Sequence, residues 1–187
     1  MKLLSDFCFS KDNSLDHRVC DELISTFNYN PELYERYDND GRPNFTQLNL
    51  TKHQKIHPII HDYIMGESFK LLDEYRNRLP DETAFWPKTF AFEEFRIKHY
   101  KEGGHDQFDM HVDSISISTA KRFLVFFWYL NDVEDGVNTD FPFLGLSFKP
   151  KKGSIFMFPP MWLFPHKGCP VIKGEKYLLS SYLHYME

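Results

Sequence analysis

Three residues of the chain, His111, Asp113 and His166, suit a divalent metal ion. The first two stand in the triplet His111-Val112-Asp113, and His166 follows much later in the chain. Two neutral imidazoles and one carboxylate occupy three positions of an octahedron and leave the other three open for a cosubstrate and oxygen. Lys176 follows His166 later in the chain. The set predicts an oxidising enzyme rather than a binding module.

Secondary structure must bring these side chains together. Residues i and i+2 of a strand point to the same face, so His111 and Asp113 can reach one ion from one strand edge. His166 must then come from a later strand. A lone His-x-Asp triplet is weak, since about one arises by chance in a chain of this composition. Its context adds weight, because Gly103-Gly104 precedes it and a long apolar run, 123–130, follows it.

The second half of the chain has the pattern of strands. Residues 90–100 are rich in aromatic and β-branched types. The run 123–130 is apolar on both faces, which predicts a buried central strand. Shorter strands are expected near 145–148, 154–158 and 176–185, with residues 149–153 forming a tight turn between two of them.

The first half has the pattern of helices. Ser14 is expected to cap a helix whose apolar stripe runs from Val19 to Phe27. A second helix is expected from Pro58 to Leu79, and Pro80 should end it. Residues 39–44 between the helices form a loop.

Helices followed by many short strands indicate an α+β fold, with the helices packed against a β-sandwich or jelly roll. No repeat or linker divides the sequence. The expected organisation is one domain over residues 1–187, with helical support over 1–88 and the jelly-roll core over 89–187.

Composition excludes several classes of protein. Hydrophobic residues make up 42% and aromatic residues 17%, too much for a disordered chain. The net charge of −5 argues against a nucleic acid as the main partner. The 3 cysteines include no Cys-x-x-Cys pair, and no stretch has the length and hydropathy of a signal peptide or membrane span. A cytoplasmic location without membrane association is therefore expected.

Residues 95–185 resemble the iron- and 2-oxoglutarate-dependent dioxygenases, in particular their prolyl 4-hydroxylase-like branch. Five segments carry the resemblance in the order of the family: Tyr100-Lys101-Glu102-Gly103-Gly104, His111-Val112-Asp113, Tyr129-Leu130-Asn131-Asp132, Lys149-Pro150-Lys151-Lys152-Gly153, and His166-Lys167-Gly168-Cys169-Pro170-Val171 continuing into Gly174-Glu175-Lys176-Tyr177.

The resemblance implies a double-stranded β-helix in which His111, Asp113 and His166 bind Fe(II). It implies that Lys176 pairs with the distal carboxylate of 2-oxoglutarate, although spacing alone would make this lysine a surface turn residue. Tyr129 and Tyr100 match positions that hydrogen-bond the cosubstrate, and Tyr129 suits the core equally well. The cofactors implied are Fe(II), 2-oxoglutarate and O2, with ascorbate as a further candidate.

The reaction implied is hydroxylation of a C–H bond with release of succinate and CO2. A peptidyl proline or another protein side chain is the leading substrate, and Trp162, Leu163 and Phe164 are candidates for a peptide groove. Phe108 and the stretch 135–141 depart from the family pattern around the substrate entrance, which leaves the substrate open. Alternatives are a nucleobase- or small-molecule-directed oxygenase and a non-catalytic metal-binding jelly roll.

Overall fold

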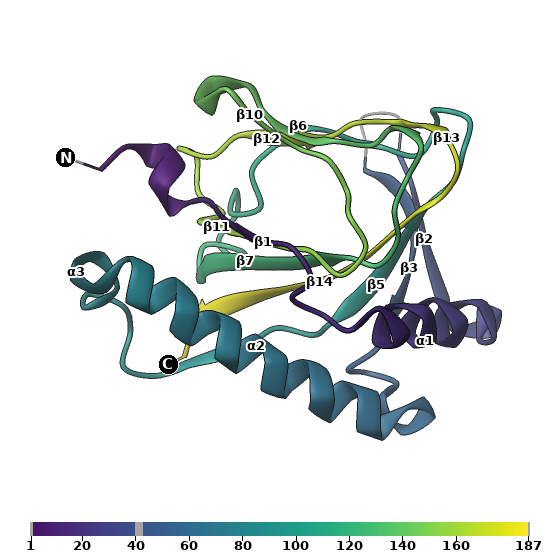
Figure 1. The fold of residues 1–187 in the computed structure, drawn as a ribbon, viewed down its shortest axis with the longest axis horizontal. Coiled ribbons are helices and arrows are strands. Elements are labelled where there is room, and N and C mark those ends of the chain that lie inside the picture. The colour runs from purple at the N-terminus through teal and green to yellow at the C-terminus, as the bar shows by residue number, and fades with distance from the viewer. Residues whose placement is uncertain (1, 40–42, 187) are drawn as a thin grey trace.

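The structure, a computed structural model, describes residues 2–39 and 43–186. Its largest element is an antiparallel sheet with strands of unequal length, the main sheet, which runs across the middle of the molecule (Figure 1). In spatial order its strands are β1 (Phe9–Lys11), β11 (Ile155–Phe158), β7 (Arg122–Tyr129), β14 (Lys176–Tyr185), β5 (Arg96–Tyr100), β3 (Asn44–Asn49) and β2 (Tyr34–Asp38), and β4 (Phe90–Phe92) pairs with the far end of β14.

A second, minor sheet lies over one face of the main sheet (Figure 1). Its strands, in spatial order, are β10 (Leu146–Phe148), β9 (Thr139–Phe141), β12 (His166–Gly168) and β6 (Phe108–His111). A separate pair joins β8 (Asp135–Gly136) to β13 (Val171–Lys173). Two facing antiparallel sheets of this kind form a jelly roll, which confirms the predicted α+β, double-stranded β-helix fold.

The helices pack against the opposite face of the main sheet, as Figure 1 shows. They are α1 (His17–Asn28), α2 (Pro58–Arg78) and α3 (Pro80–Thr83), and short 3₁₀ helices cover Leu4–Phe7, Pro31–Leu33, Gln54–Ile56 and Pro142–Leu144. The main sheet is therefore buried on both faces. This explains why strand β7 is apolar at every position except its first: Leu124, Phe126 and Trp128 face the helices, whereas alternate residues face the minor sheet.

The predicted helices are present, but one cap differs. Helix α2 ends one residue before the expected Leu79, and Pro80 begins the short α3. Helix α1 is capped by Asp16, whose carboxylate accepts a hydrogen bond from the Arg18 amide at 2.8 Å. Ser14 was the wrong cap, because its hydroxyl is used elsewhere: it donates to Gly153 O at 3.0 Å and accepts from Trp128 Nε1 at 3.2 Å.

The expected helical support over residues 1–88 is present, but this part of the chain also contributes strands to the main sheet. Strands β1, β2 and β3 lie in this part of the chain and extend the main sheet at both edges. Strand β3 is buried at every position although most of its residues are polar, so its sequence lacks the apolar alternation of a strand. Of the predicted loop at 39–44, residues 40–42 lie outside the described residues.

The strands predicted in the second half are present, whereas β8, β9 and β13 were not predicted. The expected strand over 90–100 is divided into β4 and β5, because the register with β14 shifts by one residue between the pairs Phe92↔Leu183 and Arg96↔Ser180. Such a shift is a β-bulge, which bends a strand and redirects its side chains. Within the described ranges, no helix combines the length and the hydropathy that crossing a membrane requires.

The turn at Gly153 offers a test of how the N-terminal segment is held. Gly153 has φ +76°, its carbonyl accepts hydrogen bonds from the amides of Ser14 and Leu15, and a Cβ there would lie 2.5 Å from Leu15 O. Gly153→Ala should lower the free energy of unfolding by about 3 kcal/mol, the sum of a left-handed backbone penalty and a clash with main chain. Urea denaturation measures the loss.

Gly145→Ala is the matched control. Gly145 has φ +65°, but no atom lies within 4 Å of the position that an added Cβ would take, so only the backbone penalty of about 1 kcal/mol applies. Equal losses in the two variants would show that the contact between Gly153 and residue 15 contributes nothing.

Candidate active site

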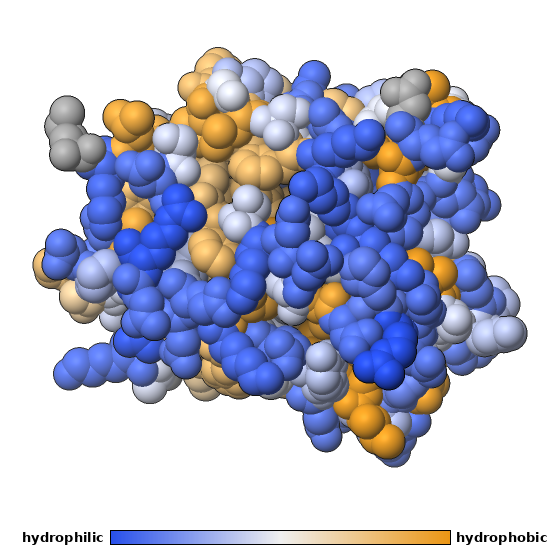
Figure 2. Space-filling view, viewed as in Figure 1, coloured by the Kyte–Doolittle hydropathy of each residue, from blue (hydrophilic) through white to orange (hydrophobic). Residues whose placement is uncertain are grey.

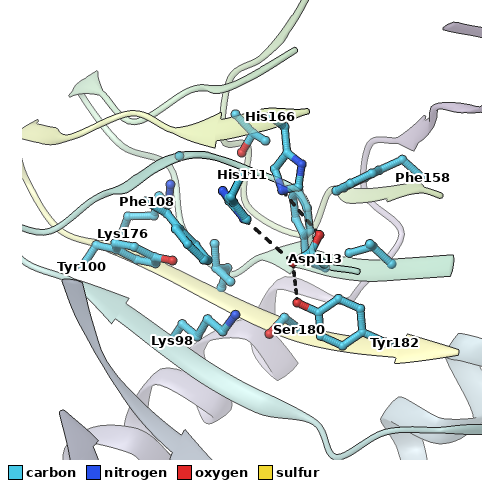
Figure 3. A pocket seen from close by; sticks show the side chains of 15 residues that line it. Lys98, Tyr100, Phe108, His111, Asp113, Phe158, His166, Lys176, Ser180 and Tyr182 are labelled. Atoms are coloured by element: carbon cyan, nitrogen blue, oxygen red, sulfur yellow. Dashed lines mark hydrogen bonds and ion pairs between the residues drawn. The ribbon is translucent and has the colours of Figure 1, made fainter. Parts of the chain in front are cut away.

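The three predicted metal ligands lie together between the two sheets. His111 ends strand β6, Asp113 follows two residues later, and His166 begins β12, where it pairs directly with His111. His111 Nε2 is 3.9 Å from Asp113 Oδ1, and His166 Nε2 is 3.5 Å from Asp113 Oδ2. One ligand atom from each of the three side chains lies within 4.8 Å of the other two. The pairing of β6 with β12 thus brings together residues far apart in the sequence (Figure 3).

Both imidazoles are oriented by main-chain carbonyls. His111 Nδ1 lies 2.7 Å from Asp109 O, and His166 Nδ1 lies 3.1 Å from Phe164 O. A carbonyl oxygen only accepts, so each Nδ1 carries the proton and each Nε2 presents a lone pair to the site. Phe108 stacks on the His111 ring with centroids 3.4 Å apart, which restrains its plane. This arrangement of imidazoles is the one that metal sites use.

One oxygen of the Asp113 carboxylate accepts a hydrogen bond, and the other accepts none from the described residues. The Tyr182 hydroxyl donates to Oδ1 at 2.7 Å, whereas the buried Oδ2 has no hydrogen-bond partner. Burial raises the pKa of Asp113, but the nearby histidines and the Tyr182 hydrogen bond outweigh it and hold the pKa below its ordinary value. Burial, and then His166, lower the pKa of His111 to about 4. An anion with an unpaired buried oxygen, beside imidazole lone pairs, fits a divalent cation.

Strand alternation builds the floor of the pocket beneath this triad. On β14, every second residue from 176 to 182 points into the pocket, and β5 and β7 contribute their inward-facing residues in register with it. The floor and walls comprise Lys98, Tyr100, Val125, Phe127, Thr139, Phe158, Lys176, Leu178, Ser180 and Tyr182. The pocket is thus mainly apolar, with two lysines at its base.

Lys176 is a buried pocket residue, not a surface turn lysine. Its side chain starts β14, only 2% of the residue is exposed, and Nζ donates to Val137 O at 3.3 Å. The ammonium also lies 4.7 Å from the centre of the Tyr100 ring. Burial lowers its pKa to about 8. Among the residues that the structure describes, no carboxylate lies within 4 Å of this cation, so it can receive an external anion.

The two predicted tyrosines lie in different places. Tyr100 lines the pocket beside Lys176. Tyr129 is buried one layer behind, and its hydroxyl shares a 2.7 Å hydrogen bond with Thr139 Oγ1, which does line the pocket. A role for Tyr129 in cosubstrate binding stays a prediction, and the structure gives it a core contact as well.

The sequence reasoning missed Lys98, Ser180 and Tyr182. All three point into the pocket from strands that had been predicted. Alternation would have found them: Lys98 lies two residues before Tyr100, and the other two share a face with Lys176. Of the candidates for a peptide groove, Phe164 belongs to the core at 2% exposure, whereas Trp162 is 73% exposed.

Comparison with known proteins agrees with this geometry. Residues 95–184 match the sequence profile of the 2OG-Fe(II) oxygenase superfamily. The chain is 31% identical to a probable prolyl 4-hydroxylase 9 of Arabidopsis thaliana over 146 residues, and 28% identical to prolyl 4-hydroxylase subunit alpha-1 of Gallus gallus over 141 residues. Residues 95–184, which hold the site, belong to the 2OG-Fe(II) oxygenase superfamily.

Its relatives place it in the prolyl 4-hydroxylase-like branch, as predicted. These alignments cover 63% and 65% of this chain but only 49% and 26% of the relatives, so the chain spans at most about half of their length. A viral collagen prolyl hydroxylase from Paramecium Bursaria Chlorella virus-1, solved as a 2OG complex, shares the fold with a TM-score of 0.72 and 23% identity. That likeness covers 96% of this chain and 97% of the viral chain. The family implies Fe(II), 2-oxoglutarate and O2 as cofactors.

The hydrogen bond from Tyr182 to Asp113 gives a prediction for metal binding. Tyr182→Phe removes the donor that fixes the carboxylate, so Fe(II) affinity should fall about tenfold, as is usual when a group behind a metal ligand is lost. Anaerobic Fe(II) titration measures it. Tyr177→Phe is the control, because the Tyr177 hydroxyl contacts Asn28 and Glu175 outside the pocket. Unchanged Fe(II) affinity in Tyr182→Phe would contradict this role.

Proposed function

We propose that the protein is an Fe(II)- and 2-oxoglutarate-dependent dioxygenase that hydroxylates a C–H bond, with a peptidyl proline or another protein side chain as the substrate. The observation that carries the proposal is one pocket in which a His-Asp-His triad and a buried lysine face the same interior space, and among the described residues this lysine has no carboxylate within ion-pair distance. A metal site with only a structural role would not need a lysine in the same pocket. A lysine without a binding role would lie at the surface, where its ammonium stays hydrated.

Different residues bind the metal and the cosubstrate. His111, Asp113 and His166 would hold the metal, since one ligand atom from each lies close to the other two at one end of the pocket. When bound, iron with 2-oxoglutarate and O2 supplies the oxidising power, and the reaction releases succinate and CO2. Lys176 pairs with the distal carboxylate of 2-oxoglutarate, and Tyr100 packs against that ammonium. This pairing would restrict the orientation of the cosubstrate in the pocket.

The apolar walls protect the reaction from water. Phe127, Phe158 and Leu178 line the pocket, and all three belong to the core between the sheets. A low-dielectric wall strengthens the attraction between Lys176 and a carboxylate. The apolar wall also excludes water, so the C–H bond of the substrate is the group that can be oxidised.

Two loops beside the triad expose apolar side chains, and this favours a peptide as the substrate. The segment after Asp113 exposes Ile115 and Ile117, at 76% and 98%, and the segment before His166 exposes Trp162. The Ser114 amide donates to Pro160 O at 3.1 Å, so these two loops lie side by side at the site. Figure 2 shows hydrophobic surface in the upper left of the molecule, over the region of β10. Apolar side chains that flank the pocket suit an extended peptide.

Relatives and neighbours point in the same direction. Curated relatives are named prolyl 4-hydroxylases, and one solved neighbour, from Trichoplax adhaerens, is a prolyl hydroxylase in complex with a hypoxia inducible factor peptide fragment. The net charge of −5 disfavours a nucleobase oxygenase acting on nucleic acid, and small-molecule oxidation remains the second candidate. A non-catalytic role is disfavoured because all three metal-binding side chains and Lys176 are present. Ascorbate, a single domain over 1–187 and a cytoplasmic location stay predictions.

The triad gives the direct test of the proposal. Asp113→Ala should abolish 2-oxoglutarate decarboxylation, measured as succinate released by the iron-loaded protein, while thermal unfolding remains cooperative. Loss of a metal ligand removes the site and spares the core. Asp73→Ala, an exposed carboxylate on α2, is the control and should retain turnover. Full turnover in Asp113→Ala would remove the triad from the mechanism.

Lys176 predicts a pH dependence for cosubstrate binding. Its folded pKa of about 8 means that the ammonium is charged at pH 7 and becomes neutral as the pH rises above 8. 2-Oxoglutarate affinity should therefore fall about tenfold between pH 7 and pH 9 with Fe(II) kept saturating. Lys176→Arg should remove this dependence, since arginine stays charged. The pH dependence should persist in Lys98→Met, and a flat profile in the unmodified protein would show that another group binds the distal carboxylate.

A further inference from the structure

Lys98 is a second cation in the pocket, and the chemistry described above does not use it. It lies on β5, where it pairs with Leu178 of β14 on one side and Gln47 of β3 on the other. In Figure 3 its side chain reaches towards Ser180 and lies below Asp113, whereas Lys176 lies beside Tyr100. The two ammonium groups therefore lie in different parts of the pocket.

No protein anion neutralises Lys98. Within residues 2–39 and 43–186, no carboxylate lies within 4 Å of its Nζ, which sits 5.1 Å from the centre of the Phe45 ring. Burial lowers its pKa to about 8, Asp113 opposes that change, and Arg96 and Arg122 add to it. Asp113 is the one facing carboxylate among these groups, and it is already held by Tyr182 and the histidines. An ammonium held in an apolar wall without a partner costs free energy, which marks it as a candidate binding group.

With metal and 2-oxoglutarate bound, the pocket would have one positive charge without a negative counterpart. A divalent metal is neutralised by Asp113 and by the carboxylate at the keto acid end of 2-oxoglutarate. The distal carboxylate of the cosubstrate neutralises Lys176. Lys98 then remains as one uncompensated positive charge in the pocket that also holds the triad. A neutral substrate would leave that charge buried and unpaired.

We propose that Lys98 binds a carboxylate of the substrate and so selects substrates that carry an acidic group close to the oxidised C–H bond. The inference rests on the proposed function and names its substrate class. The carboxylate has two possible sources: an acidic side chain next to the target residue in a peptide, or the free α-carboxylate of an amino acid. In both cases a charge-assisted hydrogen bond to Lys98 would fix the orientation of the substrate.

The test compares acids with their amides on the complete Fe(II)–2-oxoglutarate complex under anaerobic conditions. The peptide arm uses proline peptides blocked at both ends, with glutamate or glutamine beside the proline. The small-molecule arm uses L-proline and L-prolinamide. Affinity is measured by isothermal titration calorimetry for the unmodified protein, Lys98→Met and Lys98→Glu, with Lys101→Met as a control, because Lys101 is an exposed lysine just after β5.

The unmodified protein should bind the acid of at least one pair about 10- to 100-fold more tightly than the amide, the usual effect of one charge-assisted hydrogen bond. The arm in which the difference appears identifies the source of the carboxylate. Lys98→Met should remove the preference, Lys98→Glu should reverse it in favour of the amide, and Lys101→Met should preserve it. The affinity of Lys98→Met for 2-oxoglutarate should change less than about threefold, since Lys176 binds the cosubstrate; this measurement also confirms that the variant is folded.

Equal affinity for acid and amide in both arms, or no measurable binding of any of the four compounds, would overturn the role of Lys98. A preference that survives in Lys98→Met would also overturn it, as would a large loss of 2-oxoglutarate affinity in that variant. Failure of the proposed function is a separate result: the unmodified protein would then neither bind 2-oxoglutarate in the presence of Fe(II) nor release succinate with any substrate.

Discussion

The buried carboxylate of Asp113 is the constraint on which the rest of the site depends. A charged group between two apolar sheets is costly unless other groups compensate for its lost hydration. Here Tyr182 compensates one oxygen, and the other accepts no hydrogen bond from the described residues, with His166 Nε2 3.5 Å away. Two imidazoles turn their unprotonated nitrogens towards the same space because main-chain carbonyls hold their protons. A divalent metal satisfies all three groups together, which explains their arrangement better than any protein contact does.

The jelly roll makes this arrangement possible by dividing the roles of its two sheets. The minor sheet carries the histidines on adjacent antiparallel strands, so their relative position is set by strand pairing. The main sheet carries the lysines on its inner face and is supported from behind by the helices and their apolar core. The His-Asp-His triad and Lys176 thus come from opposite layers, and the pocket lies between them.

Much of this could be predicted from the sequence where a pattern repeats locally. The doubly apolar strand β7 and the helix from Pro58 follow from periodicity and from proline. His111 and Asp113 do meet as predicted, but not by alternation along one strand, because β6 ends at His111 and Asp113 lies beyond it. Strand β3 escaped prediction because it buries polar side chains, and its burial depends on neighbours supplied by β2 and β5. The cap of α1 escaped because Ser14 is bound by a turn that is distant in the sequence.

The pocket residue Lys98 also escaped prediction from the sequence. A single lysine in a strand is usually an exposed residue, and only the pairing of β5 with β14 shows that this one shares a face with the pocket. Long-range pairing of this kind cannot be read from local pattern alone. Joint binding of metal and 2-oxoglutarate in this pocket is best tested by anaerobic titration with Fe(II) and then 2-oxoglutarate, followed by visible absorption. We expect a weak charge-transfer band that requires both components, and bound metal without such a band would contradict joint binding.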